Sequence, residues 1–200
     1  MKKQDFLLVG VGGQGTLLVS DVIAATGLAA GYDVKKSEVH GMAQRGGSVT
    51  SHVRWADQVF SPLIGRGEAD LMLAFEKLEA VRFAGHMRPN ATFVISDYAI
   101  PPVSVNTGDE RYPGDEELRR ALAAVSPHVY FLPALELAAG LGNPRVSNIV
   151  LLGALSGLVA VDEALWLAAI GERVPGRTRE INRIAFLTGR RAAAGWRLAS

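Results

Sequence analysis

The sequence predicts an α/β fold with a mainly parallel β-sheet, helices on both faces and one β-hairpin excursion. The first observation is the apolar run at residues 6–9, which ends in the glycine-rich segment Gly10-Val-Gly-Gly-Gln-Gly15. The second is a helical pattern over 16–30, followed by a strand-like run over 32–39. A strand, a glycine loop, a helix and a second strand within about 35 residues form a βαβ unit, which begins a parallel sheet.

In the first half of the chain, the strand at 6–10 is expected at the centre of the sheet, because crossover helices bury both of its faces. The helix after it repeats apolar residues at three- and four-residue steps and stops at Gly31. Residues 48–55 alternate apolar and polar side chains, which is typical of a half-exposed strand, and 59–62 is the expected hairpin partner. The remaining elements of this half are a strand at 70–75, a helix at 76–85 and a strand at 91–96.

The second half is expected to be mostly helical. Residues 100–114 contain three prolines and two glycines, which predicts an irregular excursion. A helix at 116–125, a strand at 128–132, a helix opening at 133–139 and helices at 147–158, 162–171 and 178–191 follow. Asp162 and Thr178 are the expected N-caps of the last two helices. No linker divides the chain, so 1–200 is expected to form a single domain, with 191–200 as a frayed tail.

The composition argues against several classes of function. Hydrophobic residues make up 48% and charged residues 20%, which is typical of a globular protein. With a net charge of +1 and no basic stripe between aromatics, no nucleic-acid partner is expected. No apolar run approaches the roughly 18 residues of a membrane helix, and no signal peptide is visible, so we expect a cytoplasmic protein without a membrane partner. The absence of cysteine leaves no thiolate nucleophile and no thiolate ligands for an iron–sulfur cluster.

Two glycine-rich loops carry the functional signal. Gly10, Gly12 and Gly15 fit the spacing G-x-G-x-x-G, in which glycines permit a tight turn and let backbone N–H groups approach an anion. In the second loop Arg45 precedes two glycines, which suits close contact with a phosphate, a carboxylate or another backbone. We expect both loops to adjoin at the carboxyl end of the sheet, as an anion-binding or partner-facing edge. The candidate residues are Gly10, Gly12, Gly13, Gln14, Gly15, Thr16, Arg45, Gly46 and Gly47.

Several alternatives stay open at this point. A dinucleotide fingerprint needs an acid about 20 residues further on. Glu38 lies in that region, within a polar run, so a stand-alone NAD(P)-dependent oxidoreductase or a nucleotide-sensing module is possible. The loops also suit simple packing. The histidines show no metal-binding spacing, and even His40, beside the second loop, is not assigned a catalytic role. The segment Gly108-Asp-Glu110 resembles the start of a thiamine diphosphate motif but lacks the downstream asparagine pair.

The sequences of these segments resemble those of a known family, the gamma subunits or gamma domains of 2-oxoacid:ferredoxin oxidoreductases. The resemblance begins with the first loop and continues through Glu38-Val-His-Gly-Met-Ala-Gln-Arg-Gly-Gly-Ser48, Ser61-Pro62 and Gly67-Glu-Ala-Asp70. It extends to Asn148-Ile-Val-Leu-Leu-Gly153 and to residues 180–186, and so covers nearly the whole chain. The variant Ser37-Glu-Val-His-Gly-Met looks most like the beta subunit of the indolepyruvate:ferredoxin type.

The resemblance implies a Rossmann-like three-layer α/β/α domain in an enzyme that converts a 2-oxoacid and coenzyme A to acyl-CoA and CO₂ and reduces ferredoxin. Thiamine diphosphate, Mg²⁺ and [4Fe–4S] clusters are then expected in partner subunits, with coenzyme A as co-substrate. This chain would be a non-cluster, gamma-type subunit that holds none of these cofactors alone and has no catalytic or metal-binding residue. An oligomer that meets ferredoxin through the complex is implied. The expected hairpin with Trp55 and Phe60 is a candidate partner contact.

Overall fold

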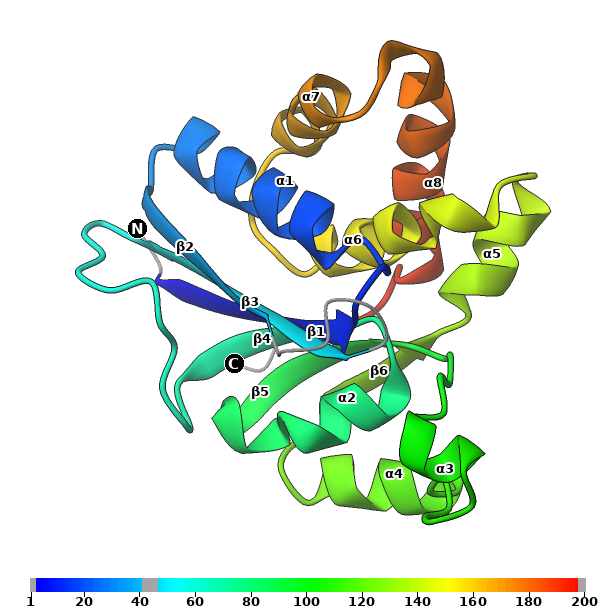
Figure 1. Cartoon of the computed structure of the whole chain (residues 1–200). Helices are drawn as coiled ribbons and strands as arrows, with labels where there is room; N and C mark the ends of the chain where they lie inside the picture. Colours follow the sequence, from blue (N-terminus) through cyan, green and yellow to red (C-terminus); the bar gives the residue numbers. More distant parts are fainter. Residues whose placement is uncertain (1–2, 41–46, 198–200) are drawn as a thin grey trace.

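The computed structural model describes residues 3–40 and 47–197, and they form one mixed sheet with helices on both faces (Figure 1). The sheet has six strands in the order β2-β3-β1-β4-β5-β6. The strands are β1 (Gln4–Val11), β2 (Asp33–His40), β3 (Ser48–Ala56), β4 (Ala69–Ala74), β5 (Met87–Ser96) and β6 (Val129–Leu132). The α/β class is therefore confirmed, and β1 lies in the interior of the sheet as expected.

The parallel part of the sheet is β1-β4-β5-β6, whereas β3 runs antiparallel to both of its neighbours. The expected βαβ unit is present, since β2 runs in the same direction as β1. However, β3 is inserted between the two strands, so β1 and β2 are not neighbours.

The predicted hairpin between 48–55 and 59–62 is wrong. β3 pairs along its length with β1 and β2, and residues 57–68 form a connection without strand structure. The half-exposed character expected for β3 is also wrong, because both of its faces are covered. Helix α1 (Thr16–Ala29) packs on one face, where Gly27 lies directly against Trp55, and the 57–68 connection lies on the other. Trp55 is fully buried, which removes it as a candidate partner contact.

Helices cover both faces of this sheet, in two groups (Figure 1). Above it, in the view of Figure 1, lie α1, α5 (Ala134–Gly140), α6 (Ser147–Ser156), α7 (Glu163–Arg173) and α8 (Arg179–Ala192). Below it lie α2 (Lys77–Arg82), α3 (Val103–Asn106) and α4 (Asp115–Ala123). Short 3₁₀ turns at Ala84–His86, Pro144–Val146 and Gly176–Thr178 complete the elements. Among the described residues, none of the helices has the length and apolarity that a bilayer crossing demands.

Each face of the sheet has its own hydrophobic core, and β1 contributes to both. Phe6 and Leu8 enter the core beneath α1, α6, α7 and α8, whereas Leu7 and Val9 enter the core on the α2 side. Successive side chains of a strand point to opposite faces, so an uninterrupted apolar run is what a doubly covered strand requires. Strand β4 is buried in the same way, except at Asp70 near its start.

Helices α6 and α8 approach each other closely through two glycines. A Cβ added to Gly189 would lie 1.7 Å from the carbonyl oxygen of Val150, and one added to Gly153 would lie 2.0 Å from that of Phe186. No other residue type fits at these two positions unless the helices move apart. This contact fixes α6, all of whose residues except Ser147 are buried.

The caps and the tail show which local predictions hold. Asp162 caps α7 as expected, since its carboxylate accepts the Ala164 N–H at 2.9 Å. Thr178 stands at the N-cap position of α8, but its hydroxyl donates backwards to the Pro175 carbonyl and does not cap the helix. In the region of the expected tail, Trp196 stacks on Tyr130 of β6, with ring centroids 4.6 Å apart, and 198–200 lie outside the described residues.

Candidate functional site

The first glycine loop connects the carboxyl end of β1 to α1, and the side chain of Gln14 holds it in place. Gln14 Oε1 accepts the Val11 N–H at 2.7 Å, and Gln14 Nε2 donates to the Phe75 carbonyl at 2.8 Å. The amide thus joins the end of β1 to the end of β4. Both ends of the Gln14 amide are therefore occupied by backbone groups of the chain itself.

The glycines of this loop are required by close contacts and by backbone conformation. A Cβ at Gly10 would lie 2.9 Å from Gln14 Oε1 and 3.0 Å from the Cβ of Phe75. Gly13 and Gly15 have φ values of +102° and +82°, which side-chain-bearing residues rarely adopt. A Cβ at Gly15 would also lie 2.3 Å from Asn148 Nδ2 of α6. The loop is therefore packed closely against a helix from the second half of the chain.

The second loop reaches the first through Gly47. The Gly12 N–H donates to the Gly47 carbonyl at 2.9 Å, directly beside the Val11–Ser48 pair of the β1–β3 ladder. The expected adjacency of the two loops therefore holds for Gly47. Arg45 and Gly46 lie outside the described residues.

A cavity of about 350 Å³ lies beside the first loop, at the carboxyl ends of β1, β4 and β5. Gly13, Gln14 and Gly15 form one wall. The other walls come from the segments that follow β4 and β5 and from the start of α6, and they comprise Phe75, Ser96, Tyr98, Leu135, Arg145, Ser147, Asn148 and Leu151. Open α/β sheets bind ligands at this edge. Thr16 begins α1 next to the cavity but is not part of its lining.

The electrostatics of this cavity favour an anion. The N-cap of α1, Gly15, and the first residues of α6, Ser147 and Asn148, line it, and neither helix has a side-chain cap or an acidic residue in its first turn. Both therefore present the partial positive charge of a helix N-terminus. Arg145 adds a guanidinium, and the lining contains no carboxylate.

One buried side chain is aimed at the same place. Asn148 is 8% exposed, and its Oδ1 accepts the N–H of Ile149 at 2.8 Å. The structure gives Nδ2 no acceptor among the described residues, and this amide nitrogen lies on the Gly15 side, within the cavity lining. An amide donor that faces a cavity is available to a ligand oxygen or to water.

Sequence reasoning missed this second wall. Arg145, Ser147 and Asn148 follow the Asn143-Pro144 break, which predicts only an interruption of helical structure. Their position beside Gly13–Gly15 depends on the packing of α6 under α8, and no local pattern encodes that contact. The only available signal was the resemblance of the segment that begins at Asn148.

Glu38 does not meet the requirement for a dinucleotide site. It lies on β2, where it pairs with Lys36 at 2.7 Å, and β3 separates this strand from β1. The fingerprint acid must end the strand adjacent to the glycine loop in order to reach the ribose. The described backbone of His40 ends the same outer strand.

Two buried carboxylates, Glu76 and Glu79, lie near the start of β3, and they serve structure. Glu76, 1% exposed, accepts the N–H groups of Glu79 and Ile100 at 2.8 and 3.1 Å and the hydroxyl of Tyr112. Burial raises the pKa of the Tyr112 hydroxyl, and its hydrogen bond to the Glu76 carboxylate raises it further. Glu79 accepts from Ser48 and pairs with Arg82. Glu76 thus caps α2, and neither glutamate is exposed to solvent.

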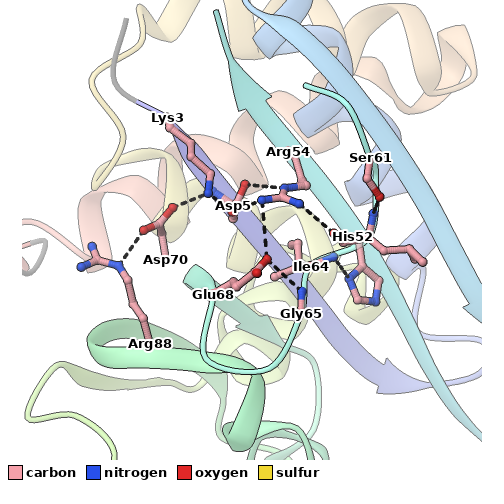
Figure 2. Close-up of polar contacts among 11 residues, drawn as sticks. Lys3, Asp5, His52, Arg54, Ser61, Ile64, Gly65, Glu68, Asp70 and Arg88 are labelled. Atoms are coloured by element: carbon pink, nitrogen blue, oxygen red, sulfur yellow. Dashed lines mark hydrogen bonds and ion pairs between the residues drawn. The ribbon is translucent and has the colours of Figure 1, made fainter. Parts of the chain in front are cut away.

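A second polar network stands at the opposite end of the sheet (Figure 2). The side chain of Asp5 is fully buried and accepts two hydrogen bonds from Arg54, both 2.9 Å long. Arg54 also donates to the Leu63 carbonyl at 2.8 Å, and the Ile64 N–H donates to His52 Nδ1 at 3.2 Å (Figure 2). These bonds hold the 57–68 connection over β3.

Further polar contacts extend this network across the same end of the sheet, from β1 to β4 and β5. Asp70 accepts the Asp5 N–H at 2.8 Å and pairs with Arg88 at 2.6 Å, and Glu68 accepts the Gly65 N–H at 3.1 Å (Figure 2). The segments around Ser61 and Asp70 that the sequence singles out are therefore parts of a structural clasp, far from the glycine loops.

The fold and the cavity together define an α/β protein with a cavity at the carboxyl edge of a mixed sheet. Residues 5–192 match the family model described as pyruvate ferredoxin/flavodoxin oxidoreductase. The chain is 42% identical over 153 residues to "Indolepyruvate oxidoreductase subunit IorB" of Archaeoglobus fulgidus, which covers 76% of each chain. It is 35% identical to the protein of the same name from Thermococcus kodakarensis, over 96% of this chain and 97% of the relative.

Solved structures show the same fold. The gamma subunit of a keto/oxoacid ferredoxin oxidoreductase from Geobacter sulfurreducens superposes with a TM-score of 0.71 at 23% identity, covering 96% of this chain and 98% of that one. The 2-oxoglutarate:ferredoxin oxidoreductase of Magnetococcus marinus, solved with 2-oxoglutarate, coenzyme A and succinyl-CoA, gives a TM-score of 0.72 at 23% identity. The match covers all of this chain and 33% of the Magnetococcus marinus chain.

The chain belongs to the pyruvate ferredoxin/flavodoxin oxidoreductase family. It is a small, gamma-type subunit of a multi-subunit 2-oxoacid:ferredoxin oxidoreductase. The resemblance inferred from the two glycine loops is thereby confirmed.

Proposed function

We propose that this subunit serves an oxidoreductase of the indolepyruvate type. The enzyme decarboxylates an aryl 2-oxoacid in the presence of coenzyme A, releases CO₂ and acyl-CoA, and passes two electrons to ferredoxin. Support comes from the curated relatives, which carry the indolepyruvate name and match up to 96% of the chain. The proposal keeps the cytoplasmic location expected from the sequence.

The redox and decarboxylating groups are assigned to partner subunits. The chain contains no cysteine, so the thiolate ligands of [4Fe–4S] clusters have to come from elsewhere in the complex. Among the described residues there is also no group of histidine and carboxylate side chains that fits a metal ion. Thiamine diphosphate with its Mg²⁺ supplies the carbanion that attacks the 2-oxoacid, and we place it in a partner subunit as well.

The role proposed for this chain is to bind the anionic part of a ligand at the first glycine loop. The observation that carries this role is the convergence of two uncapped helix N-termini, Arg145 and the buried Asn148 amide on one cavity. Coenzyme A, present in the Magnetococcus marinus structure, is the natural ligand to consider. A cavity of about 350 Å³ holds a phosphate group and its surroundings, not the whole cofactor. Arg45, Gly46 and Gly47 remain predicted neighbours of the same anion or of a partner subunit.

The test uses the complex assembled with its partner subunits. Arg145→Gln removes the guanidinium, and Arg177→Gln, an exposed arginine outside the cavity, is the matched control. We expect the KM for coenzyme A to rise about tenfold, which corresponds to the loss of about 1.4 kcal/mol from one charge-assisted contact. The KM for the 2-oxoacid should stay unchanged.

Two outcomes would contradict the proposal. An unchanged KM for coenzyme A in the Arg145→Gln complex would exclude the cavity as the anion site. Comparison of indolepyruvate with pyruvate and 2-oxoglutarate as substrates tests the reaction separately, because a preference for either smaller acid would overturn the aryl assignment and leave the cavity assignment intact.

A further inference from the structure

The outer edge of β2 is the feature that the function above does not use. β2 is the terminal strand of the sheet, and no strand in the described part of the chain pairs with its outer side. All of Asp33–His40 pairs with β3, and alternate residues of β2 turn their backbone N–H and C=O groups to the outer side, where a further strand pairs. We propose that a second copy of this chain pairs with this edge, antiparallel to β2 and about a two-fold axis through Ser37. The two six-stranded sheets then become one.

The sequence of β2 is complementary to itself in this register. In a two-fold antiparallel pair, residues directly opposite each other point to the same face of the sheet. The axis therefore stands at the position of a residue. With the axis at Ser37, Lys36 lies opposite Glu38 of the second copy, and Glu38 lies opposite its Lys36. Lys36 and Glu38 already share one face, since they are 2.7 Å apart within the strand. The dimer thus places two positive and two negative charges alternately around the axis.

Neighbouring registers are disfavoured by the same charges. Moving the axis by one residue toward the strand's start puts Lys36 opposite Lys36, and moving it by one toward the end puts Glu38 opposite Glu38. Like charges directly opposite each other destabilise a strand pair. Lysines on an edge usually prevent strand pairing, but here their position selects one register.

Helix α1 adds an apolar surface on the same side. Lys36 Nζ contacts Ser20 Oγ at 3.5 Å and Asp21 Oδ1 at 2.5 Å, so this flank of α1 faces β2. At about 100° per residue, Leu17 and Leu28 lie between Ser20 and Asp21 around the helix. Both leucines are half exposed or more, at 50% and 60%. They form an apolar stripe along the outer flank of α1.

The stripe is centred on the proposed axis. Ser37 lies four residues into β2, about 13 Å from its start. Asp21 lies eight residues before the end of α1, about 12 Å from it. Because a short turn joins α1 to β2 and Lys36 Nζ contacts Asp21, Asp21 and Ser37 stand at about the same level. The two-fold axis therefore brings Leu17 of one copy toward Leu28 of the other.

α1 packs over β3 and β2 and also reaches β1, so only its β2 flank, which carries Leu17 and Leu28, lies on the side of the second copy. None of the residues that line the 350 Å³ cavity belongs to β2, so this inference is independent of the proposed ligand.

The first test uses disulfide cross-linking of the full chain, which has no native cysteine. Ser37→Cys places two thiols on the axis, with Cα atoms about 4.5–5.5 Å apart, within disulfide range. We expect this variant to form a covalent dimer under mild oxidation. Lys35→Cys is the matched control, since its two copies stand about 14 Å apart along the strands and cannot join. A mixture of Lys35→Cys and Val39→Cys chains should again cross-link, because residue 35 lies opposite residue 39.

The second test measures the dissociation constant of the dimer by sedimentation. Lys36→Glu and Glu38→Lys should each weaken it about tenfold or more, and the double swap Lys36→Glu/Glu38→Lys should restore it. Leu28→Lys should weaken it as well. Leu63→Lys, at a leucine of similar exposure on the 57–68 connection, should not.

Three results would overturn the proposal. One is a folded Ser37→Cys chain that gives no covalent dimer at high micromolar concentration. Another is a double swap that dissociates as readily as the single variants. The third is Ser37→Cys cross-linking to a different subunit in the assembled enzyme, which would assign the β2 edge to that subunit.

Discussion

Gln14 offers the sharpest test of how the glycine loop is built. Its amide accepts the Val11 N–H and donates to the Phe75 carbonyl, and the two partners are 9% and 4% exposed. Gln14→Leu keeps a side chain of similar size but leaves both backbone groups without their partner. Each lost bond costs about 1 kcal/mol, and somewhat more where the remaining group stays shielded from water, so we expect a total of about 2–3 kcal/mol.

The measurement is urea or thermal unfolding of the full chain. For a domain of this size, about 1 kcal/mol shifts Tm by about 2–4 °C, so Gln14→Leu should lower Tm by about 5–10 °C. Gln58→Leu, at an exposed glutamine of the 57–68 connection, is the control and should stay within about 0.5 kcal/mol of the unsubstituted chain. Gln14→Glu keeps the acceptor for Val11 but turns an oxygen toward the Phe75 carbonyl, so it should also destabilise. Equal stability of Gln14→Leu and Gln58→Leu would refute the reasoning.

Two further predictions concern the core and the clasp. Gly189→Ala should destabilise the chain by about 3 kcal/mol, because the added Cβ would lie 1.7 Å from the Val150 carbonyl oxygen. Gly171→Ala in α7 meets nothing within 4 Å and should stabilise it by about 0.5–1 kcal/mol; the same sign for both in chemical denaturation would contradict the close-contact argument. Burial, with the nearby His86 and Arg54, lowers the pKa of His52 below its usual 6.5. As the pH falls, His52 therefore takes up a proton in the unfolded chain before it does so in the folded chain. The contribution of His52 to the free energy of unfolding is complete above about pH 6.5 and is lost as the pH drops below it. His52→Asn should flatten that part of the pH profile and His128→Asn should not; an unaltered profile in His52→Asn would count against the buried neutral ring.

The fold was predictable wherever neighbouring residues carry the signal. The glycine loop, α1 and the strands at its two ends follow from local periodicity and from the need for φ > 0 at Gly13 and Gly15. Asp162 as a cap is local in the same way. These elements were predicted correctly because turn, cap and strand chemistry act within a few residues.

The errors concern partners that are distant in sequence. Residues 48–55 show the alternation of an exposed strand, yet His52 and Arg54 are covered by the connection that follows them. Alternation reports the polarity of a face but does not report what covers it. Likewise, Arg145 and Asn148 lie about 130 residues after Gly15 in the chain. The packing of their helix places them on the opposite wall of the same cavity. Periodicity has no means of encoding such a contact.

The close contact between α6 and α8 has a consequence for the synthesis of this subunit. The glycines of the first loop leave the ribosome early, but the loop is bonded to Phe75 and the opposite wall of the cavity stands on α6. Gly153 and Gly189 lock α6 against α8, which ends at Ala192. A nascent chain that lacks α8 therefore carries the first glycine loop without the facing Arg145 and Asn148 in place. The proposed ligand site is complete only after α8 has been synthesised, and a subunit terminated before α8 enters assembly without it.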